Sequence, residues 1–425
     1  MKGFQFPEGF MWGAATAAHQ VEGNNQNCES WVLEHLPSTG YAEPSGDAID
    51  HYHRYPEDIA LLAKLGLNAY RFSIEWARIE PEEGEFSKAS LEHYRRMLAS
   101  CHEQGLKPVV TFHHFTSPRW LMRDGGWLDE RTPERFARYC DRAVRELGDL
   151  IGSACTLNEA NIALVIARML PFKMEEQPWW KEAAEAFGVP PDRLGLYQFV
   201  THPKMREIIY AAHRRGSEAL HGGPGDFPVG MTLALHDIQA APGGEARAAE
   251  IRKELQDIYL EPLRGDDFVG VQTYARMVVG PNGPLPPPDG AEKNQMGEEF
   301  YPEAIGGSLR YAAKITGIPL VVTENGFPSP DDSRRLEYLR RAVASVATAM
   351  DEGVDVRGYF CWSAFDNYEW VSGYGPKFGI IGVDRETQER RPKPSAFWLG
   401  DLARSNRLGG IAHPHAGACT RPWGP

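Results

Sequence analysis

Short apolar runs alternate with longer amphipathic segments along most of the chain. The apolar runs are too short for helices and are typical of parallel strands that are buried on both faces. We expect strands at 10–16, 69–74, 107–115, 155–159, 229–235, 268–274, 320–326 and 356–363. Apolar residues at helical spacing predict helices between them, at 50–65, 91–104 and 132–150. Glycines stop the first two helices, and a threonine followed by proline starts the third.

The remaining segments are less regular but contain no clear domain boundary. Residues 160–225 have a largely helical pattern, with breaks at 190–191 and 222–225. Residues 281–290 contain too many prolines for a helix or strand, so we expect a surface loop there instead of a domain linker. The tail from about 404 to 425 is expected to be irregular. We therefore predict one domain that spans residues 1–425.

Strands that alternate with helices in this way predict an α/β fold, a single (β/α)8 TIM barrel. The active site of such a barrel lies at the C-terminal ends of the strands. Two of the predicted strands end in a carboxylate, Glu159 after an apolar run and Glu324 before an Asn-Gly turn. Two carboxylates on strand tips of one sheet are what catalysis at an acetal carbon requires.

Composition and charge exclude several classes of protein. The net charge of −13 and the pI of about 5.6, without a basic stripe, exclude binding to nucleic acid. The six cysteines are scattered, so neither a zinc site nor a disulfide framework is indicated, and a reducing compartment fits best. Residues 1–7 lack a signal-peptide core, and no apolar run approaches the length of a membrane span. We expect a cytoplasmic protein without membrane partners.

Adjacent histidines and abundant aromatic residues are the other candidates for a site. His113 and His114 are neighbours on a predicted strand, so their side chains point to opposite faces and we expect no metal site and no cofactor. The chain contains 11 Trp, 16 Tyr and 19 Phe, and several of them follow the predicted strands. Aromatic rings at such positions suit the apolar faces of sugars, although packing in the core explains most of them.

Two tetrapeptides at the ends of predicted strands carry a family resemblance. Residues 156–159 read TLNE and residues 323–326 read TENG. In this order, with RFSI at 71–74 before them and the stretch 362–370 after them, they resemble glycoside hydrolase family 1, the family of β-glucosidases and β-galactosidases. The resemblance covers nearly the whole chain, from residues 10–23 to Trp398.

The resemblance implies a role for eleven residues. Glu324 matches the nucleophile and Glu159 the general acid and then base, while Asn158 matches the residue that binds the sugar 2-hydroxyl. The groups that hold the nucleophile are matched by Arg71 and Tyr274. The other sugar contacts are matched by Gln20, His114, Glu369 and Trp370, with Trp362 as the stacking floor and Phe378 as a nearby wall.

Elementary chemistry accounts for these residue types. A retaining enzyme needs an ionised and a protonated carboxyl group about 5 to 5.5 Å apart. Arg71 would keep Glu324 ionised, and the resulting anion would raise the pKa of Glu159. In the phosphosugar branch of the family, a small hydroxyl residue stands at the Glu369 position and a lysine at the Pro376 position. An anionic Glu369 would repel phosphate, so we expect an uncharged sugar.

Three positions depart from the family pattern. Ala160 stands where proline is usual, Phe115 where tryptophan is usual, and Gln272 where asparagine is usual. Phe115 lacks the indole N–H donor. These departures leave the choice of sugar open.

We expect a retaining β-glycosidase that hydrolyses terminal non-reducing β-D-glycosyl residues, with a small β-glycoside or oligosaccharide as its substrate. The alternatives are a transglycosidase on the same site and an inactive carbohydrate-binding homologue. The sequence predicts neither the oligomeric state nor the leaving group, because variable loops such as 165–200 and 280–300 supply the contacts to it.

Overall fold

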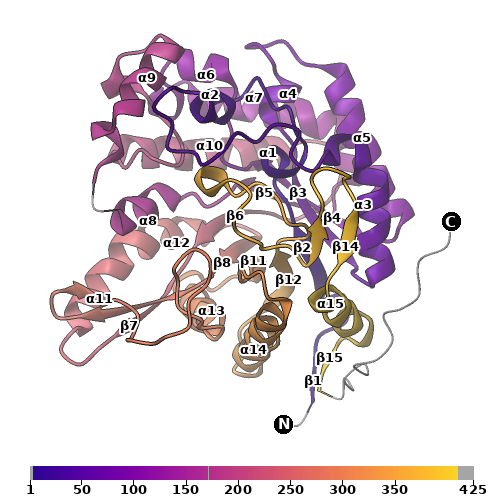
Figure 1. The fold of residues 1–425 in the computed structure, drawn as a ribbon. Coiled ribbons are helices and arrows are strands. Elements are labelled where there is room, and N and C mark those ends of the chain that lie inside the picture. Colours follow the sequence, from indigo (N-terminus) through magenta and orange to yellow (C-terminus); the bar gives the residue numbers. More distant parts are fainter. Residues whose placement is uncertain (1–2, 171, 410–425) are drawn as a thin grey trace.

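The computed structural model describes residues 3–170 and 172–409. In this part of the chain eight parallel strands form a closed barrel in the order β11-β12-β2-β3-β4-β5-β6-β8 (Figure 1). The strands are β2 (Met11–Ala15), β3 (Ala69–Ser73), β4 (Lys107–His113), β5 (Ser153–Leu157), β6 (Val229–Ala234), β8 (Phe268–Gln272), β11 (Leu320–Asn325) and β12 (Val356–Trp362). The predicted (β/α)8 barrel and its eight strands are confirmed.

Helices surround the barrel (Figure 1). Those between successive strands include α3 (His51–Leu65), α5 (Lys88–Glu103), α7 (Thr132–Leu147), α10 (Pro203–His221), α11 (Glu245–Arg252), α12 (Ile258–Leu260), α13 (Ala304–Thr316) and α14 (Asp332–Asp351). The last of the outer helices is α15 (Pro394–Ser405). The other helices are α1 (Ala18–Val21), α2 (Glu29–Glu34), α4 (Trp76–Ile79), α6 (Arg119–Arg123), α8 (Ile162–Met169) and α9 (Pro178–Phe187). None of the helices in the described residues is both long and apolar enough to cross a bilayer.

Side chains along each barrel strand alternate between the barrel interior and the helical layer. On β3, Ala69 packs in an inner cluster of apolar residues, whereas Tyr70 and Phe72 belong to the larger core beneath the helices. Arg71 shares the inner face with Ala69 and is completely buried. The alternation therefore places a cation inside the barrel.

Several short elements differ from the sequence-based expectation. The proline-rich stretch 281–290 is not wholly a loop, because Gly283–Pro284 forms β10. This strand pairs with β9 (Arg276–Gly280), which also pairs with β7 (Asp237–Ala240) in a small sheet outside the barrel. The predicted helix at 132–150 ends as α-helix at Leu147 and continues as a 3-10 turn. Of these elements, β7 and β9 are paired across about 40 residues of sequence, which local patterns do not reveal.

The two ends of the described chain are paired as antiparallel strands. Strand β1 (Phe4–Gln5) pairs with β15 (Arg407–Leu408). The expected irregular tail therefore begins later than residue 404, since α15 ends at Ser405 and β15 follows it. Residues 410–425, the rest of that expectation, lie outside the described residues. A further hairpin, β13 (Ile381–Val383) with β14 (Arg390–Pro392), precedes α15.

Candidate active site

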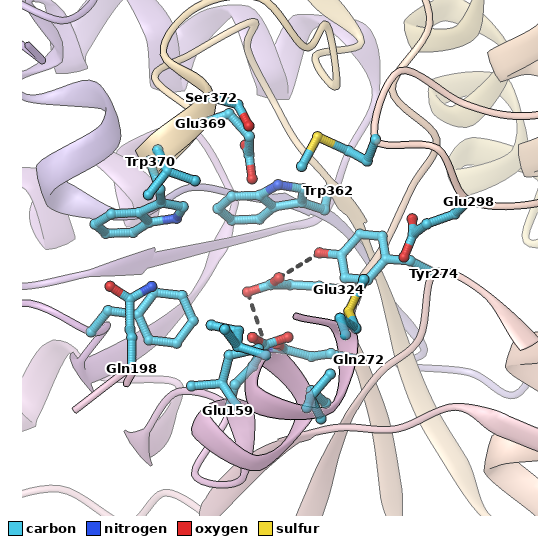
Figure 2. A pocket seen from close by; sticks show the side chains of 18 of the residues that line it. Glu159, Gln198, Gln272, Tyr274, Glu298, Glu324, Trp362, Glu369, Trp370 and Ser372 are labelled. Carbon is cyan, nitrogen blue, oxygen red and sulfur yellow. Dashed lines mark hydrogen bonds between the residues drawn. The ribbon is translucent and has the colours of Figure 1, made fainter. Parts of the chain in front are cut away.

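A cavity of about 310 Å³ opens at the C-terminal ends of the barrel strands (Figure 2). Its volume falls in the usual range for small-molecule sites. Glu324 lies near the end of β11, and Trp362 is the last residue of β12. Eight of the eleven residues expected from the sequence line it, namely His114, Glu159, Tyr274, Glu324, Trp362, Glu369, Trp370 and Phe378. The other three, Gln20, Arg71 and Asn158, each form a hydrogen bond with a residue that lines the cavity.

Three donors hold the carboxylate of Glu324. Arg71 Nη1 donates to its Oε1 over 2.6 Å, and the Tyr274 hydroxyl donates to its Oε2 over 2.6 Å. Gln272 Nε2 adds a third hydrogen bond to Oε1, at 3.0 Å (Figure 2). Both carboxylate oxygens of Glu324 are therefore held in place. Arg71 and Tyr274 lie beside Glu324, as the sequence predicts.

Asn158 is fixed in the same network. Its Oδ1 accepts hydrogen bonds from Arg71 Nη2 at 2.6 Å, Gln272 Nε2 at 2.8 Å and Thr232 Oγ1 at 3.1 Å. Its buried Nδ2 has no hydrogen-bond partner within the described residues. A buried amide donor without a partner is costly, so this N–H group is available to a ligand.

Glu159 has a different environment from Glu324. Its backbone N–H donates to Thr232 Oγ1 at 3.0 Å, and its φ of 43° lies in the left-handed region. No described side chain donates a hydrogen bond to its carboxylate, which projects into the cavity (Figure 2). The next N–H, of Ala160, donates to the Thr232 carbonyl at 3.2 Å. A proline at position 160 could not make that bond.

Electrostatics separate the two carboxyl groups. Burial, and then the negative charge of Glu324, raise the pKa of Glu159 well above its ordinary value. Burial also raises the pKa of Glu324, but Arg71, Tyr274 and Gln272 offset part of that rise. The expected direction for Glu159 is confirmed. Arg71 lowers the pKa of Glu324, as expected, but burial raises that pKa by more.

Glu369 differs from the expectation that it is an anion. Its carboxylate accepts a 3.4 Å hydrogen bond from Gln20 Nε2, which also donates to the Tyr368 carbonyl at 2.6 Å. Burial and the charge of Glu324 raise the pKa of Glu369 to about 8. Glu369 is therefore mostly protonated at neutral pH, where its carboxyl group can donate as well as accept a hydrogen bond. Repulsion of phosphate by this residue is accordingly weaker than the sequence suggested.

Aromatic rings form one side of the cavity. Trp362 stacks on His114 with ring centroids 5.7 Å apart, and Phe115 meets Trp370 edge-on at 5.3 Å. Phe115 and Trp370 both have a positive φ, as Glu159 does. Left-handed conformations at bulky residues are strained and gather at functional sites.

The paired histidines diverge as predicted. His114 lines the cavity, whereas His113 Nε2 makes a 3.0 Å hydrogen bond with Ser117 Oγ, away from the cavity. Burial lowers the pKa of both imidazoles, so both are neutral.

Sequence reasoning missed several residues of the site. Gln272 was noted as a departure from a motif, but its contact with Glu324 was not foreseen. Thr232 carried no signal, although its position at the end of the predicted strand 229–235 is the place where site residues lie. Gln198 and Glu298 line the cavity from segments without a recognisable motif (Figure 2).

Comparisons with known proteins agree with this geometry. The model of Glycosyl hydrolase family 1 matches residues 3–173 and 287–408. A solved structure described as beta-glycosidase BGL167 is 55% identical, with a TM-score of 0.92 over 96% of this chain and 100% of that chain. Beta-glucosidase A of Thermotoga maritima is 30% identical over 95% of this chain and 99% of the relative. A bifunctional beta-D-glucosidase/beta-D-fucosidase of Bifidobacterium breve is 30% identical over 92% and 97%.

The electrostatic coupling of the two carboxyl groups is testable without a substrate. We expect Glu324→Gln to lower the pKa of Glu159, because it removes the neighbouring negative charge while the positive charge of Arg71 remains. Carbon-detected NMR titration of glutamate-labelled protein would measure the shift. Glu298→Gln is the matched control, since the charge of Glu298 raises the pKa of Glu159 less than that of Glu324 does, and its effect is expected to be smaller. Equal shifts in the two variants would contradict this account.

Proposed function

The chain belongs to glycosyl hydrolase family 1 and is a retaining β-glycosidase, and on that premise we propose that Glu324 is its nucleophile and Glu159 its general acid and base. The observation that carries the assignment is the contrast between the two groups. Glu324 is held by three donors, whereas Glu159 has none and faces the same cavity. A nucleophile must be ionised and oriented, and a general acid must keep its proton near neutral pH.

In the first step, a carboxylate oxygen of Glu324 attacks the anomeric carbon while the bond from that carbon to the leaving oxygen breaks. Glu159 transfers its proton to the leaving oxygen, so the aglycone departs as a neutral alcohol. Arg71 and Tyr274 orient the attacking group through their 2.6 Å hydrogen bonds. The product is a glycosyl ester of Glu324 and an ionised Glu159.

In the second step, Glu159 removes a proton from water, whose oxygen attacks the anomeric carbon and breaks the ester bond. Glu324 leaves as a carboxylate, and both side chains return to their starting states. Formation of the ester removes the negative charge of Glu324, so the pKa of Glu159 falls and the residue becomes a base suited to the pH. One residue thus serves both steps.

We propose that the substrate is a β-D-glucoside and that the enzyme also accepts a β-D-fucoside. One relative is named a beta-glucosidase and another a bifunctional beta-D-glucosidase/beta-D-fucosidase. Asn158 is assigned to the 2-hydroxyl, because its Nδ2 is a buried donor without a partner in the described residues. Trp362 would stack against the ring, and Phe378 forms the wall near Tyr274. Gln20, His114, Glu369 and Trp370 would contact the remaining hydroxyls.

Gln272 is a further group that we assign to the nucleophile. Its side chain donates both to Glu324 and to Asn158, so it couples the nucleophile to the residue assigned to the 2-hydroxyl. Asparagine is one methylene shorter than glutamine at this position.

We also propose that the protein works in the cytoplasm. Five cysteines of the described residues are free and buried, namely Cys28, Cys101, Cys140, Cys155 and Cys361. Unpaired thiols persist in reducing compartments. Fractionation of native cells followed by activity assay would test this location.

Rescue by a small anion distinguishes the two carboxylates. Glu324→Ala is expected to abolish hydrolysis of an aryl β-glucoside, and azide is expected to restore turnover with an α-glucosyl azide as product, because azide attacks from the vacated face. Glu159→Ala is the matched comparison. There the ester still forms with a good leaving group, and azide should give the β-glucosyl azide. NMR of the products reads the configuration, and the same anomer from both variants would refute the assignment.

Loss of the Gln272 amide is expected to weaken catalysis and shift its pH dependence. A hydrogen bond to a charged group is worth about 1.5–3 kcal/mol, so Gln272→Ala should lower kcat/KM by about tenfold or more. The bond lowers the pKa of Glu324, so its removal should move the acid limb of the pH profile to higher pH. Gln198→Ala removes a cavity amide without a hydrogen bond to either carboxylate, and its acid limb should stay in place. An unshifted limb in Gln272→Ala would contradict the role.

Because Glu369 is protonated, its Gln and Ala variants are expected to differ in activity. Because its pKa is about 8, an amide reproduces its donor and acceptor at neutral pH, and Glu369→Gln is expected to keep most of kcat/KM for a glucoside. Glu369→Ala should lose about tenfold or more, since sugar hydroxyls are left without partners. For a β-xyloside, which lacks the hydroxymethyl group, the loss of kcat/KM in Glu369→Ala should be smaller. Steady-state kinetics at pH 7 would decide, and equal losses in the Gln and Ala variants would point to an anionic Glu369.

A further inference from the structure

One helix presents its apolar face to the cavity. Helix α8 (Ile162–Met169) begins three residues after Glu159. Ile162, Val165, Ile166 and Met169 all line the cavity. Their spacing is that of one face of an α-helix, which in a globular protein usually packs on the core. Here that face lines the active-site cavity, although Ile162 and Ile166 also pack against the core.

Apolar side chains continue this surface around the cavity mouth. Phe199 and Met296 line the same cavity from other segments. Met169 is 59% exposed and Met296 is 42% exposed, although both are large and apolar. Large apolar groups that gather at a pocket mouth mark a place where an apolar partner binds.

The position of α8 relative to Glu159 identifies the part of the substrate that meets it. In the proposed mechanism Glu159 protonates the leaving oxygen, so the group on that oxygen must lie beside Glu159. Figure 2 shows Glu159 directly in front of a helix at the opposite side of the cavity from Trp362 and Glu369. The aglycone therefore leaves along α8, and the sugar lies toward Trp362.

We propose that the aglycone site of this enzyme accepts an uncharged, apolar alcohol, such as a long alkyl or an aryl group, in preference to a second sugar. The proposal rests on the proposed function, because it takes the roles of Glu159 and Glu324 as given. It extends that function by naming the class of leaving group. A second sugar would place hydroxyl groups against the α8 face, whose side chains offer no donor or acceptor, and burying unpaired hydroxyls is costly.

Polar groups near this face are too few to bind a sugar in the usual way. Burial lowers the pKa of His236 to about 4, so its imidazole is neutral. Glu298 already accepts a hydrogen bond from Asn294 at 2.9 Å, through the side-chain amide. Gln198 supplies a further side-chain amide to the cavity. These groups can orient one polar atom of an aglycone. The α8 face removes the apolar surface of the aglycone from water.

A homologous series of substrates tests the proposal in the intact protein. Methyl, butyl and hexyl β-D-glucosides have leaving alcohols of similar basicity, so chain length changes mainly the contact with the aglycone site. Each buried methylene is expected to raise kcat/KM by about two- to fourfold. The hexyl glucoside should therefore exceed cellobiose. A flat series, or a higher kcat/KM for cellobiose, would overturn the proposal.

Substitutions on α8 locate the effect. Val165→Thr and Met169→Ser are each expected to lower the hexyl-to-methyl ratio of kcat/KM by about twofold or more, because they place a hydroxyl in the apolar face. The matched control is Ala167→Ser, an exposed position on the same helix that lines a different hollow, and its ratio should equal that of the wild type. Met169 is mostly exposed, so its substitution keeps the test valid if Val165→Thr fails to fold. Wild-type ratios in both variants would overturn the assignment to α8.

Binding measurements separate this proposal from the proposed function. Titration calorimetry with N-methyl, N-butyl and N-hexyl deoxynojirimycin needs no turnover. An affinity that rises with chain length, and rises less in Met169→Ser, supports the apolar site whatever the catalytic roles of the glutamates. An affinity independent of chain length overturns the apolar site even where aryl glucosides are hydrolysed. Absence of hydrolysis with every glycoside would count against the proposed function alone.

Discussion

The buried ion pair between Arg71 and Glu324 is the interaction on which the site depends. Arg71 has no exposed side-chain surface and Glu324 only 5%, and their atoms are 2.6 Å apart. Burial of an ion costs several kcal/mol even after relaxation, so such a pair persists only if other hydrogen bonds satisfy both partners. Asn158, Gln272 and Tyr274 supply those bonds. The pair is also possible only in a closed barrel, since β3 and β11 are separated in the sheet by β12 and β2.

The same network makes two identical side chains chemically different. Glu324 receives three hydrogen bonds, and Glu159 receives none from the described side chains although it shares the cavity. Burial raises the pKa of both, but only Glu324 has donors that oppose the rise. Carboxyl groups whose environments move their pKa values apart are the usual basis for dividing acid and nucleophile roles. The division here follows from the position of Arg71 on the inner face of β3.

The cavity has two chemically distinct sides. Strand tips and the segments after them supply carboxylates, amides and aromatic rings to the sugar side. On that side, one hydrogen-bond network joins Arg71, Asn158, Gln272, Tyr274 and Glu324. Helix α8 supplies an apolar face to the other side, and no described residue of that face is tied to the network. A substitution on the sugar side therefore breaks hydrogen bonds that hold the Arg71–Glu324 pair. A substitution on α8 does not disturb that pair. Hydrogen bonds define the first side and removal of apolar surface from water defines the second.

The sequence alone was sufficient for the barrel, and eight of the eleven site residues expected from it line the cavity. Strands buried on both faces are continuous apolar runs, so their positions can be read locally, and residues at their C-terminal ends must converge in a closed parallel barrel. The small strands β7, β9 and β10 were missed because they are short and depend on pairing with one another. Three properties were decided only by the tertiary structure. Gln272 reaches Glu324 across 52 residues of sequence, burial raises the pKa of Glu369 to about 8, and the apolar face of α8 lines the cavity. Each depends on distances and solvent exclusion between segments far apart in the chain, and a local pattern of residues contains neither.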